Sequence, residues 1–158
     1  MHEAVLLLGS NIEPGPHLER AVALLRARFD VRAVSRVYRS AAVGGRAPQP
    51  DFLNQAVRLR TDCPPRALRE ACRRLEERLG RRRSADRFAP RTLDLDVVLF
   101  DDLSVDFGSW RLPDPDLETH AHALVPAAEV ASDWRHPRRG MPLEALLDRV
   151  DATRLEVL

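Results

Sequence analysis

Lysine is absent from this 158-residue sequence, so arginine supplies all 25 of its basic side chains. A phosphate-binding loop of the GxxxxGK[ST] type is therefore excluded, because it requires a lysine. The glycine-rich GxGxxG motif is missing as well. Any phosphate that this protein binds must meet guanidinium groups, which hold phosphate oxygens through paired hydrogen bonds. A coding bias explains the missing lysine equally well.

Cysteine, aromatic residues and long apolar segments are also scarce. Cys63 and Cys72 are the only cysteines, and they lack the spacing of a metal site or a disulfide framework. No stretch is long enough to span a bilayer, and the apolar run after Met1 is too short for a signal sequence. A net charge of +1 and an aromatic content of 5% argue against an RNA-binding module. The composition predicts one cytoplasmic domain over residues 1–158, without a membrane or nucleic-acid partner, and a monomer is the expected state.

Hydrophobic spacing divides the chain into elements in the order strand, helix, strand, strand, helix, strand. Apolar runs and alternation predict strands, and a period of 3.6 predicts helices. The predicted strands are 3–9, 31–38, 52–60 and 93–100, and the predicted helices are 18–29, 65–79 and two short ones within 124–131 and 142–150. This order predicts an α+β fold, a ferredoxin-like sandwich in which helices flank one face of a mostly antiparallel sheet.

Two aspartates stand one residue apart at the head of the last predicted strand. Asp94 and Asp96 in "TLDLDVVLF" point to the same side, ~7 Å apart, because alternate residues of a strand share a face. Carboxylates at this spacing suit magnesium, which completes its shell with water and substrate phosphates. An ordinary exposed strand end is the alternative, and the pair alone leaves both interpretations open.

An arginine-rich segment directly before the aspartate pair favours the magnesium interpretation. It contains Arg81, Arg82, Arg83, Arg87 and Arg91, together with Phe88 and Pro90. Guanidinium groups beside a magnesium ion are what a triphosphate requires. A solvated basic loop is the alternative, but the apolar residues favour a loop that closes over a nucleotide.

A second candidate cluster lies at the start of the predicted strand 52–60, next to the long loop 39–51. Phe52 and Asn54 share the face opposite the apolar one. An aromatic ring beside an amide can stack on a flat heterocycle and hydrogen-bond its edge. Taken alone, Phe52 is more often a core or sheet-edge residue, and Glu76 in the following helix is more often a solvated side chain.

Several segments together resemble one enzyme family. They are "LLLGSN", "VYRSAAVGG" with "QPDFLNQAV", "RLEERLGRRR" and "RFAPRTLDLDVVLF". Their order and spacing are similar to those of 6-hydroxymethyl-7,8-dihydropterin pyrophosphokinase, a folate-pathway enzyme, from about residue 4 to residue 131. The segment "PRTLDLD" is the most specific of them. The resemblance implies an α+β fold and transfer of pyrophosphate from MgATP to the pterin hydroxymethyl group, with release of AMP.

The resemblance also implies a role for each matching residue. Asp94 and Asp96 would bind two magnesium ions that bridge the ATP phosphates, and Arg81 and Arg91 would be catalytic arginines. The positions implied near ATP are Glu76, Arg83, Phe88, Val97, Arg111 and Asp114. The positions implied near the pterin are Ser40, Val43, Gly44, Phe52, Asn54 and His122. The expected partners are ATP and a reduced pterin, and the expected chemistry is in-line attack of the hydroxymethyl oxygen on the β-phosphorus.

The segment "PDPDLETHAHALVP" departs from the family pattern at three positions. Asp114 stands where a histidine is usual, His120 replaces an arginine, and His122 replaces the second aromatic ring beside the pterin. An acid near a triphosphate is electrostatically unfavourable, whereas an imidazole can still stack on a ring. A second hypothesis is therefore a weakly active or inactive homologue that binds pterin or nucleotide. A third interpretation makes the two histidines a His-x-His zinc pair, for which no third ligand is evident.

Overall fold

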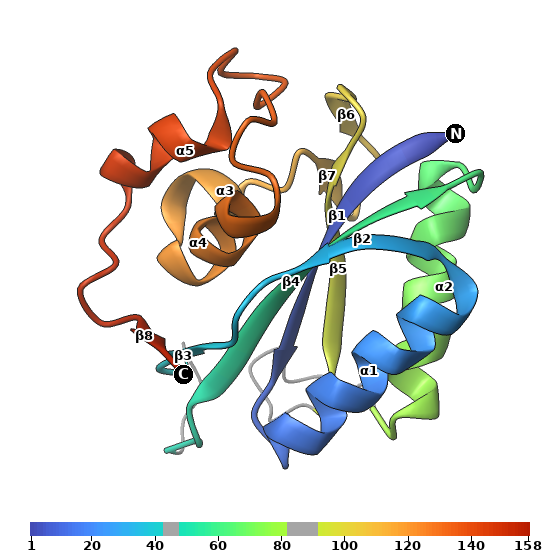
Figure 1. Cartoon of the computed structure of the whole chain (residues 1–158), viewed down its shortest axis with the longest axis vertical. Helices are drawn as coiled ribbons and strands as arrows, with labels where there is room; N and C mark the ends of the chain where they lie inside the picture. The colour runs from blue at the N-terminus through green and yellow to red at the C-terminus, as the bar shows by residue number, and fades with distance from the viewer. Residues whose placement is uncertain (43–47, 82–91) are drawn as a thin grey trace.

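The computed structural model describes residues 1–42, 48–81 and 92–158, and it has a central sheet with helices on both sides (Figure 1). The sheet strands are β1 (His2–Ser10), β2 (Asp30–Val34), β3 (Tyr38–Ser40), β4 (Phe52–Thr61), β5 (Asp94–Phe100) and β8 (Glu156–Val157). Their order is β5-β1-β4-β3-β8, with β2 also paired to β4, and each of these pairings is antiparallel. The predicted α+β, ferredoxin-like class is confirmed.

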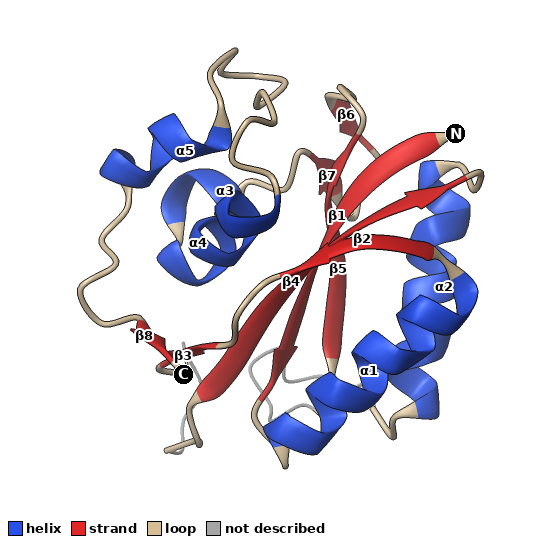
Figure 2. Ribbon diagram, in the orientation of Figure 1, coloured by secondary structure: helices blue, strands red, loops and turns tan. Residues whose placement is uncertain are grey.

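Helices cover both faces of this sheet, not one as predicted (Figure 2). One face carries α1 (Pro14–Arg28) and α2 (Pro65–Arg78); the other carries α3 (Asp116–Thr119), α4 (Ala121–Val130) and α5 (Leu143–Leu146). The reason lies in β1, whose continuous apolar run has side chains for two cores: Leu6 belongs to the α1–α2 core and Val5 to the α4 core. The described helices include none with the length and apolar character to cross a membrane.

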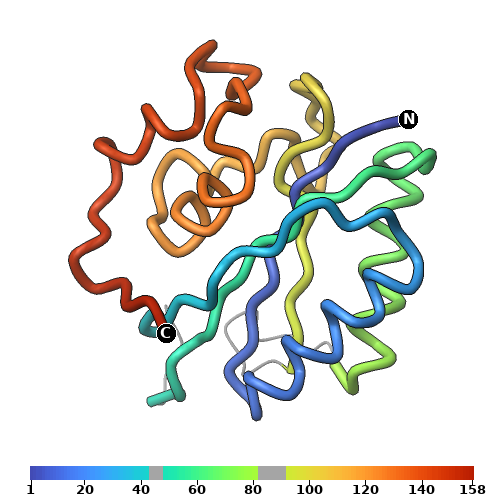
Figure 3. The backbone as a smooth tube through the Cα atoms, in the orientation of Figure 1, coloured from blue at the N-terminus to red at the C-terminus, as the bar shows by residue number. Residues whose placement is uncertain are grey.

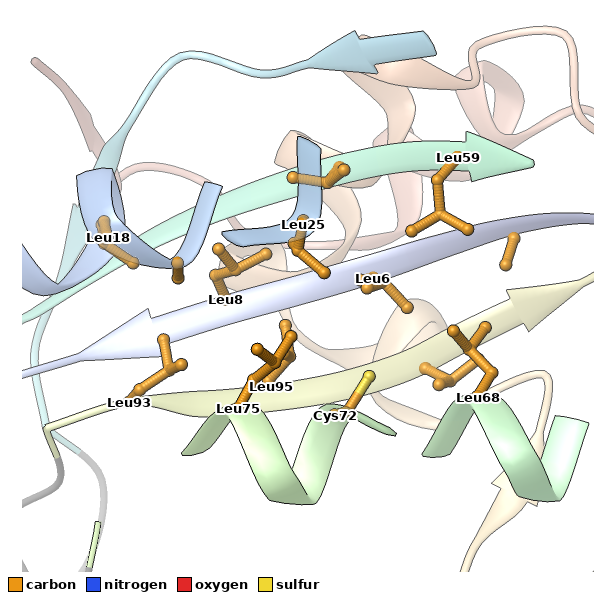
Figure 4. Packing of buried hydrophobic residues seen from close by; sticks show 14 of the residues in the cluster. Leu6, Leu8, Leu18, Leu25, Leu59, Leu68, Cys72, Leu75, Leu93 and Leu95 are labelled. Atoms are coloured by element: carbon orange, nitrogen blue, oxygen red, sulfur yellow. The ribbon is translucent and has the colours of Figure 1, made fainter. Parts of the chain in front are cut away.

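The core between the sheet and α1–α2 fixes the start of β5. Leucines from β1, α1, α2 and β4 interdigitate there with Leu93 and Leu95 (Figure 4). Both side chains are buried, so the adjacent Asp94 and Asp96 are directed to the other side of the strand. Packing of apolar side chains on one face of β5 therefore sets the position of the two carboxylates on the other.

The single predicted strand 31–38 is wrong, because the structure has two strands there, β2 and β3. Both pair with β4, Val34 opposite Val57 and Tyr38 opposite Asn54, so one more residue lies between the pairs on the β2–β3 side. Ser35 accommodates the extra residue: its N–H donates to the Ala56 carbonyl (2.9 Å), and its Oγ accepts the Ala56 N–H (2.8 Å). Such a bulge turns the chain locally, and β3 then pairs with the start of β4.

Short elements after β5 complete the fold. A small hairpin consists of β6 (Val105–Asp106) and β7 (Arg111–Leu112), and the turn η1 (Leu147–Arg149) extends α5. The two predicted helices within 124–131 and 142–150 are confirmed as parts of α4 and α5–η1. The chain then returns to the sheet, where β8 pairs with β3 (Figure 3). Four-residue α3 and the two-residue strands have no detectable period, and the sequence did not predict them.

Candidate functional site

Gly80 determines where the first candidate arginine lies. It follows the end of α2 with a φ of 85°, and its N–H donates to the Glu77 carbonyl (3.0 Å). The next N–H, that of Arg81, donates to the Glu76 carbonyl (3.0 Å). These two bonds form a Schellman motif, as expected for a glycine just past a helix end. The motif turns Arg81 back towards the last turn of α2.

Glu76 is buried beneath this turn, with 2% of its surface exposed. One carboxylate oxygen, Oε2, accepts both the N–H of Leu95 and Nη1 of Arg81, each at 3.0 Å. The interpretation of Glu76 as a solvated side chain is therefore wrong. A buried carboxylate needs such partners, and here they come from the two segments that flank the candidate site.

Arg81 joins Glu76 to the first aspartate of the pair. Its Nη1 lies 2.7 Å from Oδ1 of Asp94, and it also donates to the Leu93 carbonyl (3.2 Å). Burial alone would lower the pKa of Arg81, but the carboxylates of Asp94 and Glu76 outweigh it and raise that pKa above its usual value. Arg81 is therefore a fully charged group held between two acids.

Asp94 and Asp96 line one cavity of about 310 Å³, so the predicted shared face is confirmed. The cavity lies between β1, β4 and β5 on one side and the α3–α4 region on the other. Its lining consists of Leu7, Leu8, Gly9, Ser40, Ala41, Phe52, Asn54, Asp94, Asp96, Val98, Asp114, Asp116, His120, His122 and Ala123. We call it the larger cavity.

Negative charge accumulates around Asp96. Its side chain is accessible from the cavity, yet the surrounding protein displaces much of its water. This desolvation, followed by the carboxylates of Asp94, Asp114 and Glu76, raises the pKa of Asp96 well above its usual range, while Arg81 lowers it. A divalent cation would relieve this repulsion, and an all-oxygen donor set suits magnesium.

Side chains alone do not complete a metal cage here. In the described ranges, no group of three or more His, Cys, Asp or Glu residues is arranged to hold an ion. A magnesium ion fits this arrangement, because it commonly binds one or two carboxylates and takes its other ligands from water and phosphate. A structural zinc ion does not, since it needs four protein ligands. The zinc interpretation of His120 and His122 gains no third side chain from the structure.

The structure brings the described pterin-side predictions together at the larger cavity. Ser40, Phe52, Asn54 and His122 all line it. Asn54 is buried, and its Nδ2 donates to Ser40 Oγ (2.8 Å) and to the Tyr38 carbonyl (3.2 Å). These bonds fix the orientation of the amide. Gly9 lies beside these residues, and a Cβ added to it would make ordinary van der Waals contact with the Phe52 ring at 3.7 Å.

The three departures from the family pattern, Asp114, His120 and His122, also line the larger cavity. The His120 and His122 rings lie 5.1 Å apart at 60° to one another. Burial, and then the neighbouring His120, lower the pKa of His122. Burial, with Asp116 and Asp94 as further causes, raises the pKa of Asp114 to about 6. Both groups therefore favour their neutral forms more than they would in water.

A smaller cavity of about 80 Å³ adjoins the larger one and shares Asp94, Asp96 and Asp114 with it. All four of the described positions implied near ATP line this smaller cavity: Glu76, Val97, Arg111 and Asp114. The other lining residues are Arg69, Arg73, Asp94, Leu95, Asp96 and Trp110. The structure thus brings the predicted ATP positions together around the aspartate pair.

Four lining residues of the smaller cavity were not predicted as site residues: Arg69, Arg73, Leu95 and Trp110. The spacing of Arg69, Arg73 and Glu76 places them on one face of α2, a signal that the sequence does contain. Trp110 has no such signal, because tertiary contacts place it. Its ring stacks on Phe107 (4.4 Å, 13°), and the Arg69 guanidinium lies 4.9 Å from its centroid.

Five predicted site residues fall outside the described part of the chain. They are Val43, Gly44, Arg83, Phe88 and Arg91.

Comparison with known proteins gives a consistent set of relatives. A family model described as 7,8-dihydro-6-hydroxymethylpterin-pyrophosphokinase (HPPK) matches residues 5–132. The 2-amino-4-hydroxy-6-hydroxymethyldihydropteridine pyrophosphokinase of Synechocystis sp. is 38% identical over 155 residues, 96% of this chain and 78% of that protein. The Bacillus subtilis protein with the same name is 38% identical over 130 residues, 80% of this chain and 77% of its own.

Solved structures extend the likeness in fold. The wild-type HPPK-DHPS of Plasmodium falciparum aligns with 93% of this chain at a TM-score of 0.69 and 12% sequence identity. This chain covers 44% of that one, so it spans less than half of its length. At this level of identity the comparison shows a common fold.

Proposed function

This chain belongs to the 7,8-dihydro-6-hydroxymethylpterin-pyrophosphokinase family, and from that premise we propose that its two adjoining cavities bind the two substrates, the pterin in the larger and ATP in the smaller. The enzyme transfers the pyrophosphoryl group of ATP to the hydroxymethyl group of 6-hydroxymethyl-7,8-dihydropterin and releases AMP, a step of folate biosynthesis.

The observation that carries this assignment is the boundary between the cavities. Asp94, Asp96 and Asp114 line both of them, so a phosphate chain that leaves the smaller cavity meets the larger one at these carboxylates. Pyrophosphoryl transfer needs this arrangement, because the hydroxymethyl oxygen must reach the β-phosphorus in line with the bond that breaks.

Asp94 and Asp96 would hold magnesium at this boundary, and we propose two ions, both also bound by ATP. The two carboxylates fit this role because they face one cavity and because burial, followed by repulsion from neighbouring carboxylates, raises the pKa of Asp96 in the absence of a cation. Magnesium supplies charge neutralisation for the phosphates when it is bound. Arg81, held beside Asp94, adds a fixed positive charge at the same place.

The walls of the larger cavity suit a flat, polar heterocycle. Phe52 from β4 and His122 from α4 line it from its two sides, which supports a pterin ring between them. Asn54, fixed by its bonds to Ser40 and Tyr38, would hydrogen-bond the edge of that ring. Val43 and Gly44 remain predictions for the same wall.

The smaller cavity supplies the cationic groups that a nucleotide requires. Arg69, Arg73 and Arg111 line it together with the indole of Trp110. Guanidinium groups suit the phosphates, and an aromatic ring suits the base. Arg83, Phe88 and Arg91 remain predictions for ATP binding and catalysis.

The chemistry proceeds by positioning and charge stabilisation. The hydroxymethyl oxygen attacks the β-phosphorus, the bond from the β-phosphorus to the α-phosphate oxygen breaks, and AMP leaves. The protein forms no covalent bond to the transferred group. Its side chains align the two substrates, and Arg81 stabilises negative charge that develops on the phosphates.

Monomeric and cytoplasmic states are part of the same proposal. Sedimentation of the purified protein at assay concentration tests the monomer, and a dimer mass would overturn it.

A coupled assay for AMP release tests the function directly. We expect AMP from ATP only when both the reduced pterin and magnesium are present. Asp94→Asn should remove this activity, whereas the matched control Asp133→Asn, at an exposed acid away from both cavities, should retain it. Binding of pterin and nucleotide without AMP release would instead support the weakly active or inactive homologue.

A further inference from the structure

Glu129, near the end of α4, is bonded to the segment that joins β2 and β3. Its Oε1 accepts hydrogen bonds from Nε of Arg36 (2.6 Å) and from the hydroxyl of Tyr38 (2.8 Å). Its Oε2 accepts a hydrogen bond from the main-chain N–H of Arg36. None of these three residues lines either cavity, so the proposed function leaves this carboxylate without a role.

The bond between Glu129 and Tyr38 is charge-assisted. Burial alone would raise the pKa of Glu129, but hydrogen bonds from Arg36 and then Tyr38 outweigh it and lower that pKa. Tyr38 is 6% exposed, and burial, followed by its bond to Glu129, raises the pKa of its phenol. At neutral pH a neutral phenol therefore donates to an ionised carboxylate, and such a bond is stronger than one between two neutral groups.

Tyr38 reaches the larger cavity through its main chain. It pairs with Asn54 of β4, and its carbonyl accepts a hydrogen bond from Nδ2 of Asn54 (3.2 Å). Ser40 Oγ accepts the second bond from the same Nδ2 (2.8 Å). Because a carbonyl can only accept, the Tyr38 carbonyl fixes which atom of the Asn54 amide faces it. Both hydrogens of Nδ2 are then in use, and Oδ1 is the atom that can accept an N–H from a ligand.

Glu129 shares its helix with His122, another lining residue of the larger cavity. The two residues are about two helical turns apart in α4, so their side chains leave the helix on the same side. His122 lines the cavity, and Glu129 binds Tyr38 of β3. The Glu129–Tyr38 bond therefore joins the helix that supplies one part of the cavity lining to the strand that orients Asn54, another part.

We propose that Glu129 and Tyr38 are positioning residues for the pterin, a proposal that rests on the proposed function. The bond between them sets the spacing between α4 and β3, and with it the separation of His122 from Asn54. Its effect is selective for one substrate. The smaller cavity is lined by residues of α2, β5 and the segment 110–114, which this bond does not touch. Loss of the bond therefore weakens the pterin complex and leaves ATP binding intact.

Tyr38→Phe and Glu129→Gln test the proposal in the AMP assay and by calorimetry. Tyr38→Phe removes only the hydroxyl, and Glu129→Gln replaces one accepting oxygen by an amino group. Each variant should raise the KM and Kd for the pterin about tenfold, with kcat and the KM for ATP changed less than about twofold. The double variant should be no weaker than the single ones, because all three lose the same contact. The matched control is Glu156→Gln, which removes an exposed carboxylate bonded to Arg39 of β3 (3.4 Å) and should change neither KM.

A spectroscopic measurement separates positioning from general stability. The sequence contains two asparagines, Asn11 and Asn54, so two side-chain amide pairs of this type are expected in a ¹H–¹⁵N spectrum. In Tyr38→Phe the Asn54 pair should shift and exchange faster with water, because the carbonyl that holds Nδ2 is less firmly placed. The Asn11 pair should stay unchanged, since its Nδ2 is held by Gln49 Oε1 (3.0 Å) and the Pro50 carbonyl (3.3 Å).

Other outcomes overturn the proposal. If the bond only stabilises the fold, both variants lower the Tm but leave the pterin Kd and the Asn54 signals as in the wild type. An equal rise in KM for both substrates would show a general loosening of the protein, and additive effects in the double variant would show that the two residues act separately. If Glu129→Gln does not fold, Tyr38→Phe decides alone. Wild-type protein that binds no pterin and releases no AMP defeats the proposed function, whereas an active wild type with an unchanged pterin Kd in Tyr38→Phe defeats this inference alone.

Discussion

Arg81 is bonded to Glu76 twice, through its main-chain N–H to the Glu76 carbonyl and through Nη1 to the Glu76 carboxylate, each at 3.0 Å. The main-chain bond is part of the turn that ends α2, and the side-chain bond holds the guanidinium in the candidate site. Because the same guanidinium reaches Asp94 at 2.7 Å, the end of α2 and the start of β5 are joined at one cation. The stability of the helix end and the geometry of the candidate site are therefore coupled.

Glu76→Gln tests this coupling. The amide oxygen can still accept the Leu95 N–H, but Arg81 loses one of its two carboxylates. We expect a loss of about 1–3 kcal/mol in the free energy of unfolding, since a buried charged hydrogen bond is removed. We also expect a lower kcat. Urea denaturation and the AMP assay measure the two effects, with Glu77→Gln, exposed on the next position of α2, as control. A variant as stable as the wild type would show that the Glu76 carboxylate makes no net contribution to the free energy of unfolding.

Gly80→Ala isolates the role of the turn. An added Cβ at Gly80 meets nothing within 4 Å, so its effect is the strain of an L-residue at a φ of 85°. We expect a destabilisation of about 1–2 kcal/mol and a lower kcat, because Arg81 follows directly. Gly15→Ala is the matched control: it too meets nothing within 4 Å, but it lies in the first turn of α1 without a positive φ. There alanine should be neutral or stabilising by up to about 1 kcal/mol.

Much of this site could be predicted because it depends on local rules. Alternation along β5 places Asp94 and Asp96 on one face whatever lies opposite, and a glycine after an amphipathic helix marks its end. The same alternation directs Phe52 and Asn54 to the cavity. These predictions needed only the period of a strand and the conformational freedom of glycine, and the structure confirms the placements.

The remainder depends on partners distant in sequence. Glu76 is buried because the Leu95 N–H, 19 positions away, needs an acceptor, and no helical pattern contains that information. Ser35 divides the predicted strand because its hydroxyl bonds to β4. Trp110 reaches the smaller cavity through its stacking with Phe107 and Arg69. Such placements are decided by tertiary contacts, which override local propensity.

Asp96→Asn should have opposite effects with and without magnesium. Burial, followed by repulsion from neighbouring carboxylates, destabilises the ionised form of Asp96, so removal of this charge should raise the Tm of the protein in EDTA at neutral pH. The same change should abolish the rise in Tm that magnesium and a non-hydrolysable ATP analogue produce together, because the cation loses a ligand. Differential scanning fluorimetry measures both. A variant that keeps the full ligand-induced rise would refute the metal assignment of Asp96.

Trp110 offers a direct probe of the nucleotide. The sequence contains two tryptophans, Trp110 and Trp134. Trp134 lines neither cavity, and its Nε1 donates to the Asp101 carbonyl (3.2 Å). In Trp134→Phe, where Trp110 is the sole tryptophan, magnesium with a non-hydrolysable ATP analogue should change the fluorescence saturably. In the matched variant Trp110→Phe the same titration should leave the emission nearly constant. The reverse pattern would place the nucleotide away from the smaller cavity.

Asp114 should give the protein an unusual pH dependence. Its folded-state pKa, about 6, lies above the unfolded value of 3.8, so between these values the folded state binds more protons than the unfolded state. Stability contributed by this group is therefore highest below about pH 4 and falls as the pH rises towards 6. Above that pH the ionised carboxylate destabilises the fold by at most about 2 kcal/mol, since the group is partly accessible.

Asp114→Asn removes this unfavourable charge while its amide oxygen can still accept the Asp116 N–H. The variant should be more stable than the wild type at pH 7, with the difference shrinking to nothing near pH 4, in urea unfolding at each pH without magnesium. Its KM for ATP should fall, because a carboxylate no longer faces the phosphates at the boundary of the cavities. Asp102→Asn, at an exposed acid outside both cavities, controls for the loss of one carboxylate. An Asp114→Asn variant that is less stable than the wild type at pH 7 would mean that the ionised carboxylate has a favourable partner in the folded state, which contradicts its raised pKa.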